Sequence, residues 1–297
     1  MTPLSRDQEI VVGVDPGDPS VPTLAWAAGE ADRRNLALRL VLAVPPLHDT
    51  QHVDSTPQHM FLRARGREAL DAASETISRL SPKACVTTEL VDGRPAVVLC
   101  REATALTGMV VVGSRRLSVP AEILSTRSVA VPLSAQADCP VVVVRAPEHT
   151  ANISACLVVG VDGSPSSQGA VKFAFEEASL RHASVLALWV WPRPAISLSA
   201  AETGMEERAR LLEEAVAGWS ARYPAVNVTR NVSRGHPVEE LARASSDALA
   251  VVVGRRGHGG YTGMRLGSVP HGLLHRAECP VITVPGERSE RVQNTAV

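Results

Sequence analysis

The sequence predicts an α/β protein built from two similar domains in tandem, each a parallel sheet of five strands with helices on both faces. Three observations support this fold class. Short runs of Val, Ile and Leu alternate with amphipathic segments of helical length, which is typical of parallel strands buried on both faces. Hydrophobic residues make up 45% of the 297 residues but aromatic residues only 3%, so aliphatic side chains must form the core. Most of the chain also occurs twice.

The internal repeat sets the domain organisation. Asp15 corresponds to Asp162, and a short polar segment that contains Pro147 separates the two copies. We therefore expect a first domain over residues 1–147 and a second over residues 155–297. The matching segments are EIVVGVDPGDPS and CLVVGVDGSPSS at 9–20 and 156–167, MVVVGSRR and AVVVGRRG at 109–116 and 250–257, and DCPVVVV and ECPVITV at 138–144 and 278–284.

The strands of the second domain are indicated by short aliphatic runs. Most of these runs are continuous, as expected for strands buried on both faces, and one alternates apolar with polar residues. The expected strands are CLVVGVD (156–162), SVLALWVW (184–191), VNVTRNV (226–232), LAVVVG (249–254) and PVITVP (280–285).

The helices are indicated by apolar residues that recur every three or four positions. In both halves a Gly-x-Pro turn, DGRP at 92–95 and RGHP at 234–237, places proline in a first helical turn, where its missing N–H costs little. The order is then βαβαβαβαβ, and such sheets bind ligands at the carboxyl ends of their strands. The expected helices are SSQGAVKFAFEEASLRH (166–182), ETGMEERARLLEEAVAGWSARY (202–223), PVEELARASSD (237–247) and one that starts near VPHGLLHR (269–276).

The composition argues against several classes of protein. A formal net charge of −1 gives no electrostatic reason to bind nucleic acid or an anionic membrane. The five cysteines are scattered and lack CxxC spacing, so neither a zinc site nor a disulfide framework is indicated. No apolar run reaches the roughly 18 residues of a membrane span, and the N-terminal segment lacks the apolar core of a signal peptide. We expect a cytoplasmic protein.

The segment GRRGHGGYTGMRLGS at 254–268 contains six glycines in fifteen residues and follows the expected fourth strand directly. Glycine lets backbone N–H groups approach a ligand closely, so the segment indicates either an anion-binding loop or a flexible turn. N–H groups of such a loop, joined to a helix N-terminus at Ser268, make a good phosphate site. The spacing matches neither GxxxxGK[ST] nor a GxGxxG after the first strand.

Three side chains near this loop are candidates for a role. Asp162 ends the first strand, where it either hydrogen-bonds a nucleoside or caps the next helix, and its recurrence as Asp15 favours a role beyond capping. His258 has no Asp or Glu between 251 and 277 to orient it, so we interpret it as a solvated loop residue rather than a catalytic base. Arg256 is placed to meet either phosphate or water.

These motifs resemble those of a known family. VVGVDGSPSS at 158–167, GHPVEEL at 235–241 and the spacing Gly-x2-Gly-x9-Gly-Ser from Gly254 to Ser268 look like an ATP-binding universal stress protein. The two copies resemble the tandem arrangement found in actinobacteria. The resemblance implies Rossmann-like domains of the adenine nucleotide alpha hydrolase type that bind ATP, with or without Mg²⁺.

The resemblance also assigns contacts to residues of the second half. Asp162 would contact the nucleoside and the backbone of Val190 would meet adenine, while Gly160 would lie beneath the nucleotide. The remaining expected contacts, along the ribose and the phosphates, are Gly254, Arg256, Gly257, Gly267, Ser268 and Val269.

The first half departs from this pattern. Arg116 stands at the position of the second glycine, Arg127 lies opposite Gly267, and Pro16 replaces Gly163. Side chains there would fill the space that phosphates need. If the first half binds nucleotide, its contacts are expected from Gly13, Asp15, Val44, Gly113, Ser128 and Val129.

We therefore expect a nucleotide-binding regulatory module of the stress response, with one strong ATP site in residues 155–285 and no catalytic residues. The alternatives are a slow ATPase or adenylyl-transferring enzyme, a cyclic-AMP-binding variant, and a protein-interaction module that has lost nucleotide. The enzyme is disfavoured because neither an oriented base nor a loop lysine is present.

Two further expectations concern assembly and a single glycine. The apolar fifth strands, PVVVV at 140–144 and PVITV at 280–284, would be aggregation-prone edges alone, so we expect them to pair in an intramolecular pseudo-dimer. Whether whole chains also form a homodimer is left open.

Gly257→Ala is expected to weaken ATP binding roughly tenfold to a hundredfold, because the backbone there approaches phosphate or has a positive φ. The same change is expected to leave the stability of the free protein nearly unchanged.

Overall fold

A computed structural model describes residues 8–17, 19–46, 56–114, 129–145, 155–191, 199–258 and 265–286, the side chains of 199–203 excepted. Within these ranges each half alternates strands with helices. The first half contains β1 (Glu9–Gly13), α1 (Val21–Arg34), β2 (Ala37–Val44), α2 (Pro57–Leu80), β3 (Val86–Asp92), α3 (Pro95–Glu102), β4 (Met109–Ser114), α5 (Ala130–Gln136) and β5 (Val141–Arg145). The second contains β6 (Cys156–Gly160), α6 (Pro165–Arg181), β7 (Ser184–Trp191), α7 (Ser199–Arg222), β8 (Val228–Arg234), α8 (Pro237–Ala244), β9 (Ala250–Gly254), α9 (Ser268–Arg276) and β10 (Val281–Val284).

Local sequence chemistry explains where the helices begin. Helices α1, α2, α3, α6 and α8 each have proline in the first turn, and Ser20, Thr56 and Ser164 cap α1, α2 and α6 through their side-chain oxygens. Helices α1 and α6 end alike, because Asn35 and His182 both adopt the left-handed conformation. The strands and helices expected for the second half are confirmed, with their ends shifted by at most three residues.

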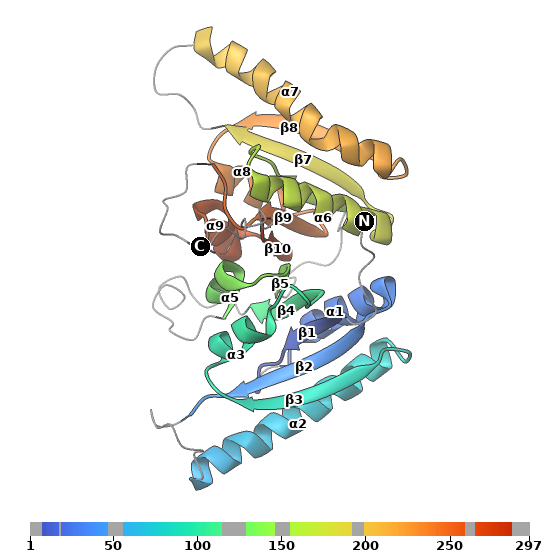
Figure 1. Ribbon diagram of the computed structural model, residues 1–297, viewed down its shortest axis with the longest axis vertical. Coiled ribbons are helices and arrows are strands. Elements are labelled where there is room, and N and C mark those ends of the chain that lie inside the picture. The colour runs from blue at the N-terminus through green and yellow to red at the C-terminus, as the bar shows by residue number, and fades with distance from the viewer. Residues whose placement is uncertain are drawn as a thin grey trace, which may run out of the picture.

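The ten strands of the described residues form one sheet, in the order β3-β2-β1-β4-β5-β10-β9-β6-β7-β8, which Figure 1 shows along the long axis of the molecule. Within each half every strand pair is parallel, whereas β5 and β10 pair antiparallel. The predicted α/β class is confirmed, and so is the pairing of the two fifth strands. The two predicted sheets are therefore halves of one continuous sheet.

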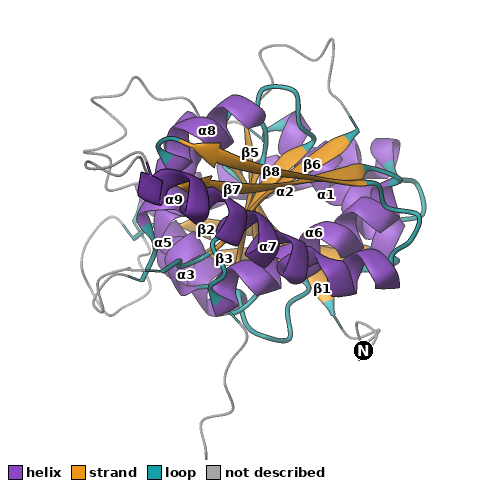
Figure 2. Ribbon diagram, turned by 90° about the horizontal axis from the view of Figure 1, so that it is seen from above, coloured by secondary structure: helices purple, strands orange, loops and turns teal. Residues whose placement is uncertain are grey.

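The helices form two layers, and each layer covers one face of the sheet (Figure 2). Helices α1, α2, α6 and α7 bury side chains such as Ile77 and Phe175 against one face, and α3, α5, α8 and α9 bury Leu133 and Leu273 against the other. Alternate residues of each strand enter opposite layers, as Ile10 and Val11 do in β1. Both faces of the sheet are thus apolar, which accounts for the continuous aliphatic runs.

Across the centre of the molecule, α1 packs against α6 and α5 against α9. The sheet twists strongly along its length. Although β5 and β10 are antiparallel, the arrowheads of β2 and β7 both point to the left in Figure 1. The carboxyl ends of these two strands therefore lie on the same side of the molecule.

Candidate functional site

The strand order places the glycine-rich loop at the carboxyl edge of the second half. There β6 lies between β7 and β9, so the chain leaves β6 and β9 toward opposite faces of the sheet. Asp162 follows β6 and Gly254 ends β9, and the first turns of α6 and α9 begin nearby. Residues 259–264 of the loop lie outside the described part of the chain.

Asp162 joins the two turns that line this edge. Its Oδ1 accepts a hydrogen bond from the backbone N–H of Ser164 at 3.0 Å, and its Oδ2 accepts one from the backbone N–H of His258 at 2.9 Å. The cap of α6 is Ser164, whose Oγ accepts from Ser167 N at 3.1 Å. Asp162 is therefore not the helix cap, and within the described residues its carboxylate fixes the loop after β9 to the turn after β6.

The environment of Asp162 favours its ionised form. Burial alone would raise its pKa, but hydrogen bonds from the side chain and backbone of Ser164 and from the backbone of His258 hold the pKa below its ordinary value of 3.8. Asp162 is accordingly a carboxylate at neutral pH.

Two glycines permit this close arrangement. A Cβ on Gly257 would lie 2.2 Å from Oδ2 of Asp162, and a Cβ on Gly254 would lie 2.6 Å from the backbone carbonyl carbon of Ser166. Neither glycine has a positive φ. Of the two reasons expected for glycine at position 257, a positive φ is not observed, and the close contact that is observed is with Asp162.

Two serines at the start of α6 also hold the loop, and the sequence analysis predicted this role for neither of them. The Oγ of Ser166 accepts from Arg256 N at 3.3 Å, and the Oγ of Ser164 donates to Arg256 O at 3.5 Å. A signal was present in GSPSS, because a serine before proline marks a helix cap, but the partner of Ser166 lies 90 residues away. Arg256 itself is an exposed residue.

Gly163, in the turn after β6, has a positive φ of 78°. A Cβ there would lie 3.1 Å from the indole of Trp189, a buried residue of β7 that the sequence analysis did not single out. The turn after β6 thus passes directly over an aromatic ring. Proline has a φ near −65° and cannot adopt this conformation, so Pro16 in the first half requires a different turn.

The first turn of α9 provides backbone N–H groups at the other side of the loop. Gly267 occupies the N-cap position, has no side chain to accept from the first turn, and donates its own N–H to Arg255 O at 2.9 Å. Ser268 is exposed and Val269 half-buried. The positive end of the helix dipole adds to these N–H groups, which makes the turn suited to an anion.

The other expected contacts of the second half have structural explanations. Gly160 ends β6, and a Cβ on it would come within 3.2 Å of Val253 and Leu241, so glycine is needed there for packing. Val190 lies in β7 opposite Ser233 of β8 and is half-buried. Both lie at the carboxyl edge, Val190 beside Trp191, the last residue of its strand.

The counterpart residues of the first half have different local settings. Asp15 is exposed, and its Oδ1 accepts from Gly17 N at 2.7 Å. Gly13 is the last residue of β1, and Gly113 is the last but one of β4. A Cβ on either glycine would lie within 3 Å of a neighbouring side chain. Val44 is buried at the end of β2, and Val129 precedes α5. Ser128, Arg116 and Arg127 lie outside the described residues.

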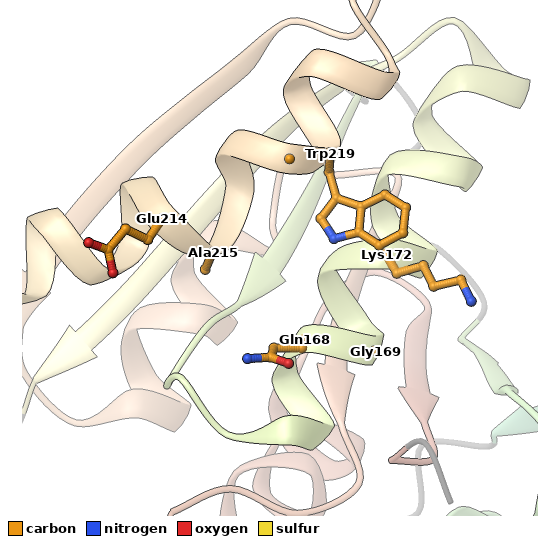
Figure 3. Close-up of a pocket in the computed structure, with 7 residues that line it drawn as sticks. Gln168, Gly169, Lys172, Glu214, Ala215 and Trp219 are labelled. Atoms are coloured by element: carbon orange, nitrogen blue, oxygen red, sulfur yellow. The ribbon is translucent and has the colours of Figure 1, made fainter. Parts of the chain in front are cut away.

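A separate hollow of about 320 Å³ lies between α6 and α7 (Figure 3). Gln168 and Lys172 of α6 and Trp219 of α7 line it, and Gly169 and Gly218 leave it open. None of the predicted site residues contributes to it.

Among the described residues no group of three or more His, Cys, Asp or Glu is arranged to hold a metal ion, and all five cysteines are free. No helix of the described residues has the length and apolarity needed to cross a membrane.

The fold and this edge define a tandem α/β protein whose second half carries a braced, glycine-lined loop at the switch point of its sheet. The model of the universal stress protein family matches residues 8–145 and 157–285. The chain belongs to the universal stress protein family, in a tandem form with two such domains.

Individual relatives agree with this assignment. A universal stress protein of Mycobacterium tuberculosis is 35% identical over 288 residues, which cover 92% of this chain and 95% of the relative. One of Mycolicibacterium smegmatis is 33% identical over 299 residues, covering 96% and 99%. The crystal structure of a universal stress protein from Archaeoglobus fulgidus has a TM-score of 0.72, covers 95% of this chain and 98% of that chain, and is 17% identical, so it shows likeness of fold.

Proposed function

We propose that this protein is an adenine-nucleotide-binding regulatory module that binds ATP at the carboxyl edge of its second half. The observation that carries the proposal is the Asp162 brace. A half-buried, ionised side chain fixes the loop after β9 so that the loop and the uncapped first turn of α9 border one edge. A braced loop loses less conformational entropy on binding than a flexible one.

The donor set fits the phosphates of a nucleotide. Gly267 offers no side-chain acceptor to the first turn of α9, so the N–H groups of Ser268 and Val269 suit phosphate oxygens. Arg256 is exposed beside them and adds positive charge. The nucleoside would lie toward Val190 and Asp162. Binding of ATP there would convert the free protein into an occupied state. A regulatory module would respond to the difference between these two states.

Mg²⁺ would enter with the phosphates rather than through a protein cage. Magnesium sites on proteins use one or two carboxylates together with phosphate oxygens and water. The carboxylate of Asp162 lies at this edge, and it already accepts hydrogen bonds from two backbone N–H groups. The described residues thus favour nucleotide alone, or nucleotide with its own metal.

Mass spectrometry of the small molecules that copurify with the chain, followed by calorimetric titration with ATP and with cyclic AMP, tests the proposal. We expect an adenine nucleotide and one strong site per chain. Two equal sites, or none, would contradict it. Preference for cyclic AMP would change the ligand but keep the site, and steady-state ATP turnover above about one per second would favour an enzyme.

A protein-interaction module is the second candidate, and one observation favours it. The exposed large hydrophobic side chains among the described residues all belong to the first half: Val21, Met60, Phe61, Leu80, Val97 and Leu106. A chain that binds no nucleotide in calorimetry while retaining its fold would support this candidate.

A further inference from the structure

Four charged side chains form a closed ring where α1 meets α6. Arg34 of α1 reaches across to Glu177 of α6 through its Nη2, at 2.5 Å, and Arg181 of α6 reaches back to Glu30 of α1, at 2.7 Å. Each arginine also bonds through Nε to the glutamate four residues earlier on its own helix. Every arginine therefore joins one glutamate of its own half to one of the other half.

The ring is buried and repeats the internal symmetry of the chain. The glutamate side chains are 0% and 1% exposed and the arginine side chains 7% and 10%. Glu30 and Glu177 are separated by the same 147 positions as Asp15 and Asp162, and so are the two arginines. The two halves thus present the same Glu-x3-Arg surface to each other, which is the isologous contact of a two-fold dimer.

Aromatic rings complete the contact in the same reciprocal way. The Arg181 guanidinium lies 3.9 Å from the ring centre of Trp26 on α1, and that of Arg34 lies 5.5 Å from the ring centre of Phe173 on α6. Trp26 and Phe173 are again 147 positions apart. Each arginine is thereby held by an aromatic ring as well as by two carboxylates.

Among the described residues, the charged side chains that pair in and around the ring belong to α1 and α6, and they are three arginines and two glutamates. Arg33 of α1 adds a bond to Glu30 at 3.4 Å and is partly exposed. Burial would raise the pKa of Glu30, but Arg34 and Arg181 lower it, whereas burial and the nearby Glu30 raise the pKa of Glu177. A buried ion cluster of this kind adds little net stability, but it is very costly to leave one partner unmatched.

We propose that this ring selects the pairing partner: a half-domain surface pairs only with another that carries the same Glu-x3-Arg pattern. The apolar contact between β5 and β10 is poorly selective, because valine and isoleucine pack against many apolar edges. The ring adds a charge match that a wrong or shifted partner does not satisfy. The fitting partners are the other half of the same chain and either half of a second copy.

A charge exchange in the full chain tests this. Exchanging the two residues in one half, Glu30→Arg with Arg34→Glu, keeps the attraction within α1 but places like charges opposite α6. Making the corresponding exchange in α6 as well, Glu177→Arg with Arg181→Glu, restores every opposite-charge contact. Arg210→Glu with Glu214→Arg, an exposed pair at the same spacing on α7, is the control.

We expect either one-half exchange to lower the melting temperature by about 10 °C. In the same variants the exchanged half still matches the exchanged half of a second copy, so the particle mass measured by light scattering should at least double relative to the natural chain. The four-residue exchange should recover both the natural mass and most of the melting temperature, and the α7 control should change neither.

Two results overturn the proposal. The first is a four-residue exchange that fares no better than the one-half exchanges, whether in folding or in mass. The second is a one-half exchange that melts at a lower temperature without any change in particle mass, because that result assigns the ring to stability alone.

Discussion

Gly257 and Asp162 lie so close together that a methyl group on residue 257 would force them apart. A Cβ at position 257 would lie 2.2 Å from Oδ2 of Asp162, where a carboxylate oxygen and a methyl group cannot coexist. In Gly257→Ala we therefore expect the bond from His258 N to Asp162 to break. The free protein should lose about 1 to 2 kcal/mol, and ATP affinity should fall roughly tenfold to a hundredfold. Chemical denaturation and calorimetry measure the two effects.

The expectation that Gly257→Ala leaves the free protein nearly unchanged thus gives way to a measurable loss of stability. Gly218→Ala is the matched control, because a Cβ there meets no atom within 4 Å and the position is inside α7. That change should stabilise the protein by about 0.5 to 1 kcal/mol and leave binding alone. Equal stability of Gly257→Ala and the natural chain would show that the brace contributes nothing.

Asp162 should give the second half a defined sensitivity to acid. Its folded-state pKa lies below the ordinary 3.8, so its contribution to stability is complete above that value and is lost as the pH falls through the lower, folded-state pKa. We expect Asp162→Asn to be less stable than the natural chain at pH 7, with the difference shrinking below about pH 4. Urea unfolding at several pH values measures it, and a difference that stays constant to pH 3 would argue against the brace.

At the scale of elements, the uncapped first turn of α9 lowers the stability of the free protein but favours the binding of phosphate. Gly267 has φ −71° and ψ 162°, which any residue adopts, and a Cβ there would make only ordinary contacts. Gly267→Asp should cap α9 and stabilise the free protein by about 0.5 to 1 kcal/mol. The same carboxylate repels phosphate, so ATP affinity should fall at least about tenfold.

Gly267→Ser separates the cap from the charge. Serine caps almost as well as aspartate but is neutral, so it should stabilise α9 to a similar degree with a smaller loss of affinity. Calorimetry with ATP compares the two variants. Equal affinities for both would place the phosphates away from this turn.

Elements recognised from sequence were those whose pattern is local. The aliphatic runs and helical periodicities of the second half are local, and the helices and strands follow them closely, as β7 does at Ser184–Trp191. The carboxyl edge was also predictable, because parallel topology alone puts Asp162 near Gly254. The roles of the glycines were not, since the close contact of Gly257 depends on where a side chain 95 positions earlier points.

Long-range polar pairs were the part that sequence reasoning could not supply. Ser166 and Arg256 meet across 90 positions, and Glu30 and Arg181 across 151. Helical spacing reveals that Glu30 precedes Arg34 by one turn, but an exposed pair has the same spacing. Only the packing of α1 on α6 distinguishes a buried ring from a solvated one.

For the whole molecule, the joint between β5 and β10 determines how separated halves behave. Val142 and Ile282 are fully buried where these strands pair, and both become edge residues when the halves are apart. We expect residues 1–147 expressed alone to self-associate or precipitate, and coexpression with residues 155–297 to give a one-to-one complex by light scattering. Halves that are each soluble and monomeric would contradict the pairing.

The antiparallel joint at the centre of a continuous sheet also has a mechanical consequence. If each well-packed half moves as a rigid body, the pair of strands that joins the halves acts as the pivot of their relative motion. A small rotation at β5 and β10 displaces each element in proportion to its distance from the pivot. The Glu–Arg ring near the centre would hardly move, while α2 and α7 at the two ends (Figure 1) would travel furthest. The two ends of the molecule are therefore where a slight change at its middle would be most visible.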